Sequence, residues 1–212
     1  MGHMVILAVS SSVVATFDAD GRRYQRLYQQ GVPVTPLTEI GPAPGRGTTV
    51  AITPDTAIFG TAELPLGLLR RRLEELAILH PSVAFELDGV MVPSYGGIAG
   101  YAASLAGELA SKRVHRVEVV DGTKVEVAVV WGHDDGPPIE HAWANGLRAE
   151  GGHIDGLRKA LARPESGERV AVLSVVVPFA EYDGRTKRRL LTTGLDKLVA
   201  GVVRRALEEA AP

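Results

Sequence analysis

The 212-residue sequence contains no cysteine, and aromatic residues make up only 5% of it. Without cysteine the chain can form no disulfide, has no thiolate nucleophile and cannot bind zinc through sulfur. No apolar run approaches the ~20 residues that a transmembrane helix requires. There is also no G-x-G-x-x-G pattern, since the glycine pairs at 96–97 and 151–152 only precede predicted helices. We therefore expect a cytoplasmic protein with no membrane contact and no cofactor.

A strong charge of one sign is missing as well. The net charge is −2, which gives no overall positive field for nucleic acid, so direct nucleic-acid binding is not expected. His80, His115 and His133 have no ligand spacing, which argues against a metal site. The remaining composition, 45% hydrophobic and 23% charged, is typical of a soluble globular protein long enough to bury a core.

The N-terminal part has the pattern of a β-hairpin. Two strand-like runs, Val13–Phe17 and Arg22–Gln29, are joined by a turn that ends in Asp-Gly, which supplies the positive φ angles of a tight hairpin. Gly31–Gly47 is rich in proline and glycine and predicts a loop or an irregular edge. Another β-branched strand is expected at Thr48–Thr53.

The rest of the chain mixes strands with helices. Val114–Val120 and Val125–Trp131 predict a second hairpin, and Ile139–Ala144 a further strand. The continuous β-branched run Val170–Val177, ended by Pro178, predicts a central strand buried on both faces. Helices and one short strand complete the expected elements: helices at Leu64–His80, Gly96–Ser111, Glu150–Ala162 and Leu195–Ala211, and a strand at Ser82–Leu87.

Hairpins interspersed with helices, rather than strict βαβ alternation, predict an α+β fold. We expect a hairpin domain with its connecting loop in residues 1–50. Residues 51–212 should then form a mixed sheet with helices on one face.

Seven stretches, in their order along the chain, resemble the transducer domain of the type II topoisomerase B subunits, namely gyrase B and its topoisomerase IV counterpart. They are GVPVTPL, GTTVAITPDTAIFGTAEL, LLRRRLEELAILHPSVAFEL, YGGI, VEVAVVW, EGGHIDGLRKAL and AVLSVVVPFAEYDGRTKRRL. The resemblance runs from about Val5 to about Lys197. It implies that residues 51–212 are transducer-like, similar to the second domain of ribosomal protein S5. Residues 1–50 would be a hairpin remnant of the gyrase-type ATPase domain.

The resemblance also implies a functional loop. Arg185–Arg189 is the densest cationic cluster in the chain, and a solvated face before the last helix is its alternative interpretation. In the family a Gln-Thr-Lys loop contacts the γ-phosphate of ATP, and its threonine and lysine fall on Thr186 and Lys187. The family's glutamine is Arg185 here, a permanent cation that does not copy a neutral contact.

Other family features have no counterpart. The glycine-rich phosphate turn, the adenine-reading aspartate and the water-activating glutamate are missing, so we expect no ATPase or topoisomerase activity from this chain alone. The connection between Ala162 and Val170 is shorter than in the family. This internal difference favours a naturally divergent, stand-alone paralogue.

Candidate catalytic residues are Lys187, His153 and Asp155. His153 and Asp155 open a predicted helix, whose dipole keeps a histidine neutral and suits acid–base chemistry. Their alternatives are a loop histidine bonded to the backbone and a first-turn aspartate paired with the dipole. Arg185, Thr186 and Tyr182 are candidate ligand-binding residues. Five aromatic side chains could line an apolar pocket or belong to the core: Tyr95, Tyr101, Trp131, Trp143 and Tyr182.

Two functions follow. In the first, a gyrase-B-like protein without ATP binding takes a small-molecule ligand, either for cofactor-free cyclase, isomerase or lyase chemistry or to sequester an antibiotic. In the second, the chain is a transducer fragment or regulatory paralogue that acts in DNA topology together with a component of gyrase. A homodimer is left open. Lys187 discriminates: burial against an enclosed pocket favours the first function, and exposure on a flat surface favours the second.

Overall fold

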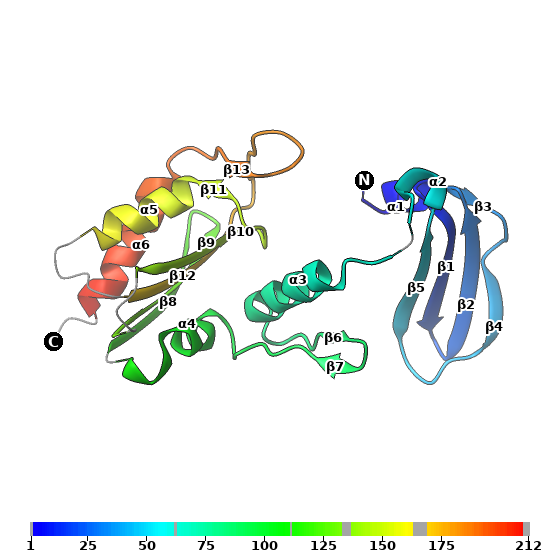
Figure 1. The fold of residues 1–212 in the computed structure, drawn as a ribbon, viewed down its shortest axis with the longest axis horizontal. Coiled ribbons are helices and arrows are strands. Elements are labelled where there is room, and N and C mark those ends of the chain that lie inside the picture. The colour runs from blue at the N-terminus through cyan, green and yellow to red at the C-terminus, as the bar shows by residue number, and fades with distance from the viewer. Residues whose placement is uncertain (1, 62, 111, 133–136, 163–168, 210–212) are drawn as a thin grey trace. The chain divides into compact units, whose positions relative to one another are not determined.

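A computed structural model describes residues 2–61, 63–110, 112–132, 137–162 and 169–209. The chain divides into two compact units, Met1–Pro65 and Leu66–Pro212 (Figure 1). Within the described ranges, no helix has the length and apolar character needed to cross a membrane. The division lies after the expected boundary at residue 50, because that boundary falls inside a strand of the first sheet.

Unit 1 is a twisted antiparallel sheet with two short helices. Its strands pair in the order β3-β2-β1-β5, and β4 also pairs with β2. The elements are α1 (Gly2–Ala8), β1 (Ser10–Ala19), β2 (Arg22–Gln29), β3 (Val32–Pro33), β4 (Thr38–Pro42), β5 (Gly47–Pro54) and α2 (Thr56–Phe59). The predicted hairpin is confirmed, with Asp20 and Gly21 at φ 53° and 75°. The proline-rich stretch forms the irregular edge β3 and β4.

One face of this sheet is apolar and largely uncovered. Val13 lies opposite Ile52 and Ala15 opposite Val50 in the β1–β5 register, so these side chains and Phe17 project to the same side. Val13 and Ala15 are buried, but Phe17, Val50 and Ile52 are 40%, 50% and 46% exposed. We call these five residues the apolar face of unit 1.

Unit 2 contains a four-stranded mixed sheet in the order β10-β12-β9-β8, in which only β10 and β12 are parallel. Its elements are α3 (Leu66–Leu79), β6 (Glu86–Leu87), β7 (Val90–Met91), α4 (Ile98–Ala106), the 3-10 turn Gly107–Leu109, β8 (Lys112–Val120), β9 (Thr123–Trp131), β10 (Ile139–Ala144), β11 (Glu150–Gly151), α5 (Gly152–Leu161), β12 (Arg169–Val176), β13 (Arg189–Leu190) and α6 (Leu195–Glu209). The α+β class is confirmed. The strand expected at Ser82–Leu87 is reduced to β6.

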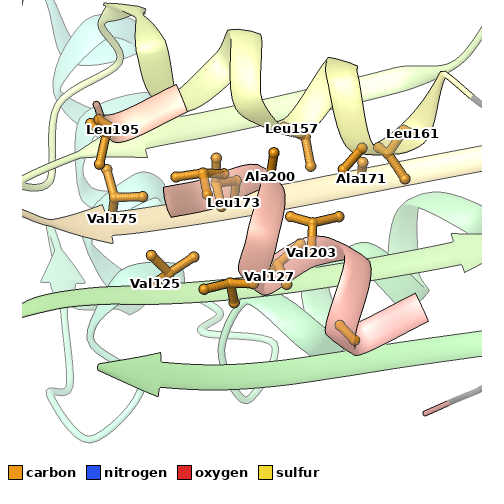
Figure 2. Packing of buried hydrophobic residues seen from close by; sticks show 14 of the residues in the cluster. Val125, Val127, Leu157, Leu161, Ala171, Leu173, Val175, Leu195, Ala200 and Val203 are labelled. Atoms are coloured by element: carbon orange, nitrogen blue, oxygen red, sulfur yellow. The ribbon is translucent and has the colours of Figure 1, made fainter. Parts of the chain in front are cut away.

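The predicted central strand is confirmed as β12, which lies between β10 and β9 and is buried on both faces. On one face Leu173 and Val175 pack with Val125 and Val127 beneath α5 and α6, which contribute Leu157 and Val203 among others (Figure 2). On the other face Val170 and Val172 pack with Trp143 and residues of α4.

The expectation of helices on one face of the sheet was therefore wrong. α5 and α6 cover one face, and α4 covers the other with Ile98, Ala102 and Ala106 (Figure 1). Both faces of β12 are apolar, so helices must pack on both sides of the sheet. The small residues of α4 let that helix approach the sheet closely. The shortened connection before β12 falls on residues 163–168, which lie outside the described residues.

Candidate functional site

The loop at residues 178–188, which follows β12, carries most of the predicted site residues. Its start is fixed by Asn145, at φ 48°, whose side chain bonds the main chain of Val177 in both directions. The Asn145 Oδ1 accepts from the Val177 nitrogen at 2.7 Å, and Nδ2 donates to the Val177 carbonyl at 3.0 Å. These two hydrogen bonds therefore fix the position at which the strand ends and the loop begins.

Lys187 lies on the surface. Its φ is 53°, and its Nζ sits 5.5 Å from the centre of the Tyr182 ring, a cation–π arrangement. Tyr182 is held in place because its hydroxyl donates to the Ala144 carbonyl at 3.3 Å, and partial burial raises its pKa. Arg185 and Thr186 are both exposed. These four residues form an open cationic loop.

The loop reaches the start of α5 through a short pair of parallel strands. β11 and β13 pair Glu150 with Arg189 and Gly151 with Leu190, and the Glu150 nitrogen donates to the Arg188 carbonyl at 2.9 Å. A Cβ at Gly151, whose φ is 132°, would overlap the Leu190 carbonyl oxygen, so the close approach depends on glycine. The two segments predicted to share a site are thus adjacent along their backbones.

Their side chains nevertheless occupy different environments. His153 is fully buried at the start of α5, and neither ring nitrogen makes a well-formed hydrogen bond with a described residue. Burial lowers the pKa of His153, against the opposing effects of the Ala149 backbone and the Asp155 carboxylate. Asp155 is exposed on the first turn. A buried neutral ring and an exposed lysine are poorly placed to act on one substrate, so the catalytic set stays a prediction.

The predicted aromatic pocket comes together in part, at a different place. The Tyr101 hydroxyl lies 2.9 Å from Nδ1 of His141, and the Tyr101 ring centre is 5.5 Å from that of Tyr95 and 6.4 Å from that of Trp143. Trp131 instead contacts Lys112, and Tyr182 belongs to the cationic loop. His141 of β10 joins this cluster and was not among the predicted site residues. No group of three or more potential metal-ligating side chains occurs within the described ranges.

The sequence matches the B subunits of DNA gyrase. No family model matches the chain. It is 29% identical to the chloroplastic/mitochondrial gyrase B subunit of Nicotiana benthamiana over 99% of this chain and 34% of that protein. It is 28% identical to the gyrase B subunit of Chlamydia pneumoniae and to the type 2 topoisomerase B subunit of Aquifex aeolicus, over 98% and 95% of this chain.

Solved structures of gyrase B proteins also match this chain. The 43K ATPase domain of Thermus thermophilus gyrase B, solved in complex with an aminocoumarin, superposes with a TM-score of 0.80 at 25% identity over 98% of this chain and 65% of that one. The Myxococcus xanthus gyrase B subunit gives 0.80 at 26% identity over 96% and 68%. This chain is homologous to type II topoisomerase B subunits. It spans about a third of the length of the curated relatives.

These matches show homology to the B subunits in general, whereas the sequence patterns indicated one particular domain, the transducer domain. The matching Thermus structure is described as the ATPase domain and is covered in part, so the finer assignment to the transducer domain stays a prediction. The α+β fold is shared with these structures, whereas the likeness to ribosomal protein S5 is untested.

Proposed function

We propose that this chain is a transducer-like relative of the gyrase B subunits and acts in DNA topology by binding one of the subunits of DNA gyrase. Residues 51–212 would be its transducer-like part, with the S5-like fold that this implies. Residues 1–50 would be the remnant of an ATPase domain. The observation that carries the proposal is the exposure of Lys187 on an open loop, together with similarity to gyrase B along nearly the whole chain.

The loop has the character of a recognition surface rather than of a substrate pocket. Arg185 and Lys187 present two cations on a segment whose start is anchored by Asn145 and whose end is anchored by β13. Neither cation is among the residues that line two cavities of unit 2, one beside α3 and α4 and the other beside α4, β8 and β9. A cationic loop on a rigid scaffold suits an acidic surface on a partner protein.

Unit 1 supports the same proposal independently. Phe17, Val50 and Ile52 leave an apolar patch on a sheet whose edge strand β5 is exposed almost throughout. Contiguous exposed apolar side chains on a sheet typically mark a contact surface for another protein. The proposed partner would cover this face as well as bind the loop.

The experiment is a binding titration of the purified chain against the A subunit of gyrase and, separately, the B subunit of gyrase from the same organism. We expect one of them to bind, and Arg185→Ala with Lys187→Ala to weaken binding by about tenfold or more, because two charged contacts are removed. The matched control is Lys197→Ala with Arg204→Ala, two exposed cations on α6, which should leave binding unchanged.

Absence of binding to both gyrase proteins would contradict the proposal. So would equal weakening by the loop pair and the α6 pair, because binding would then reflect overall charge. A parallel supercoiling assay with gyrase shows whether binding changes DNA topology.

A further inference from the structure

The outer side of β8 is an open edge of the unit 2 sheet. β8 is the last strand in the order β10-β12-β9-β8, and no further described strand pairs with it. Its pairing with β9 runs from Lys112–Trp131 to Val120–Thr123 without a bulge. Prolines, β-bulges and very short strands commonly protect such an edge, and β8 has none of them. Its backbone is therefore available to another strand.

The turn between β8 and β9 determines which β8 residues face outward. Asp121 and Gly122, with φ angles of 48° and 77°, form a two-residue hairpin turn. The residues that flank such a turn, Val120 and Thr123, exchange hydrogen bonds, and bonding toward the partner strand then alternates along β8. Every second residue therefore directs its N–H and carbonyl groups away from β9: these residues are Arg113, His115, Val117 and Val119. In the described part of the chain, no backbone group outside the sheet bonds to them.

The same four side chains lie on the α4 side of the sheet. In the β8–β9 register Arg113 is opposite Val130 and His115 is opposite Ala128, and both of these β9 residues pack with α4. A groove of about 310 Å³ lies between α4 and β8. Its α4 wall consists of three small residues, Ala99, Gly100 and Ala103. The first half of β8 thus borders a groove with an apolar wall.

The second half of β8 instead exposes two valines. Val117 and Val119 are 50% and 65% exposed, and neither belongs to the core cluster beneath α4. One strand therefore carries a groove at its start and protruding apolar side chains toward its end. Antiparallel pairing of two such strands about a two-fold axis places the valines of each copy beside the groove of the other.

We propose that two copies of this chain dimerise through their β8 strands, which pair antiparallel about a two-fold axis at Arg116. In this register Arg113 lies opposite Val119 of the second copy, and His115 lies opposite its Val117. Only this register bonds all four outward-facing residues of each β8 to the other copy's β8. The two four-stranded sheets join into one, and the valines of each copy lie along the open side of the other copy's groove.

The charges of β8 are compatible with this pairing. The Arg116 side chains of the two copies meet at the axis on the other face of the sheet, but Glu118 and Glu209 bond each of them at 2.7 and 2.6 Å. The two Arg113 residues lie at opposite ends of the paired strands. Their apolar stems can cover the opposite valine while the guanidinium groups stay in water.

The proposed interface is separate from the surfaces of the proposed function. β8 shares no residue with the loop at residues 178–188 or with the apolar face of unit 1. Dimerisation can therefore fail while gyrase binding holds, and gyrase binding can fail while dimerisation holds.

The first test introduces single cysteines, because the natural chain has none. Arg116→Cys places one thiol per copy at the axis, in a non-hydrogen-bonded pair whose Cα atoms are about 4.5 Å apart, within the range of a disulfide. We expect mild oxidation to convert this variant to a covalent dimer, seen by non-reducing electrophoresis. Glu118→Cys is the matched control, since the two side chains are 22% and 23% exposed and lie on the same face.

The control should form little covalent dimer. The two copies of position 118 are four positions out of register, roughly 13 Å apart along the strands, which is beyond disulfide reach. Cross-linking of Glu118→Cys as complete as that of Arg116→Cys would overturn the proposal, because the disulfides would then report random collisions or another register.

The second test measures the oligomeric state of the 212-residue chain by sedimentation velocity, where we expect a dimer that dissociates on dilution. Val119→Lys puts a cation opposite Arg113 of the second copy and should weaken dimerisation about tenfold or more. Adding Arg113→Glu should restore the dimer, because each lysine then faces a carboxylate. Val90→Lys, at an exposed valine of β7, is the control and should leave dimerisation unchanged.

Circular dichroism of each variant shows that the monomer remains folded, as expected for changes at exposed positions. A chain that stays monomeric at every concentration up to millimolar would overturn the proposal. So would a dimer that Val119→Lys does not weaken, or one that Val119→Lys and Val90→Lys weaken equally.

Discussion

The two units place strands of similar length in very different surroundings. In unit 2, Val170, Ala171, Val172 and Leu173 of β12 are each 0% exposed, because helices cover both faces of the sheet. In unit 1, β5 is exposed from Gly47 to Thr53, although Val50 and Ile52 are as apolar as their counterparts. Unit 2 thus carries its own core, whereas unit 1 leaves apolar side chains exposed on β5.

The largest expected effect separates these two strands. Leu173→Ala in unit 2 should lower the free energy of unfolding by about 2–5 kcal/mol, because it removes a fully buried side chain and leaves a cavity. Ile52→Ala in unit 1 should cost less than about 1 kcal/mol, because that side chain is half exposed already. Urea unfolding of both variants of the 212-residue chain measures the difference. Similar losses would show that unit 1 has a core of its own.

An intermediate effect concerns pH and should arise in unit 2. The pKa of His153 is lowered in the folded state by burial, so only the unfolded chain takes up the proton as the pH falls below the ordinary value of about 6.5. Stability is therefore complete above that pH and declines as the pH falls toward the lowered pKa. The decline can reach about 1.4 kcal/mol per pH unit for one proton.

The check is denaturant unfolding between pH 7.5 and 5 for the natural chain and for His153→Leu. In the variant, the slope of the free energy of unfolding against pH should decrease by the contribution of about one proton. His141, whose pKa is also lowered by burial, should still contribute to the pH dependence of stability in this variant. An unchanged slope in His153→Leu would mean that the ring is accessible to protons in the folded state.

The smallest effects should be alike in both units. Asp18 pairs with Arg23 at 2.6 and 2.7 Å in unit 1, and Glu118 pairs with Arg116 and Arg205 in unit 2. Hydrogen bonds from these arginines lower the pKa of each carboxylate, so the stabilisation exists above the unfolded pKa and is lost on acidification. Both pairs face solvent, where screening makes such interactions weak.

We expect Asp18→Asn and Glu118→Gln each to lower the melting temperature only slightly at low salt. The decrease should shrink further when salt is added, because exposed charges are screened. Thermal unfolding at two salt concentrations measures it. A large, salt-insensitive loss for one variant alone would show that its ion pair is part of a packed interface.

The sequence predicted the helices and strands better than it predicted which face of the sheet each helix covers. Both hairpins and β12 follow from alternation, turn residues and a β-branched run, which are local signals. The same run implied burial on both faces, yet helices were expected on one face only. The helix α4, made of small residues, gave no strong amphipathic pattern to indicate its position.

The site residues show the same limit. The loop that carries Lys187 follows from the end of a central strand, but its exposure was left open by the sequence. The burial of His153 depends on what packs around the start of α5 and has no local signature. The aromatic cluster draws on α4 and β10, so only the folded chain brings Tyr101, His141 and Trp143 together.

Hydrogen exchange followed by mass spectrometry, with and without the gyrase protein that binds, tests the central claim most directly. In the free chain we expect slow exchange in β9 and β12 and faster exchange in β5, because only the former lie within a covered sheet. The gyrase partner should slow exchange in β5 and in residues 178–188 and leave β12 unchanged. Protection confined to other segments, or none at all in β5 and the loop, would contradict the account.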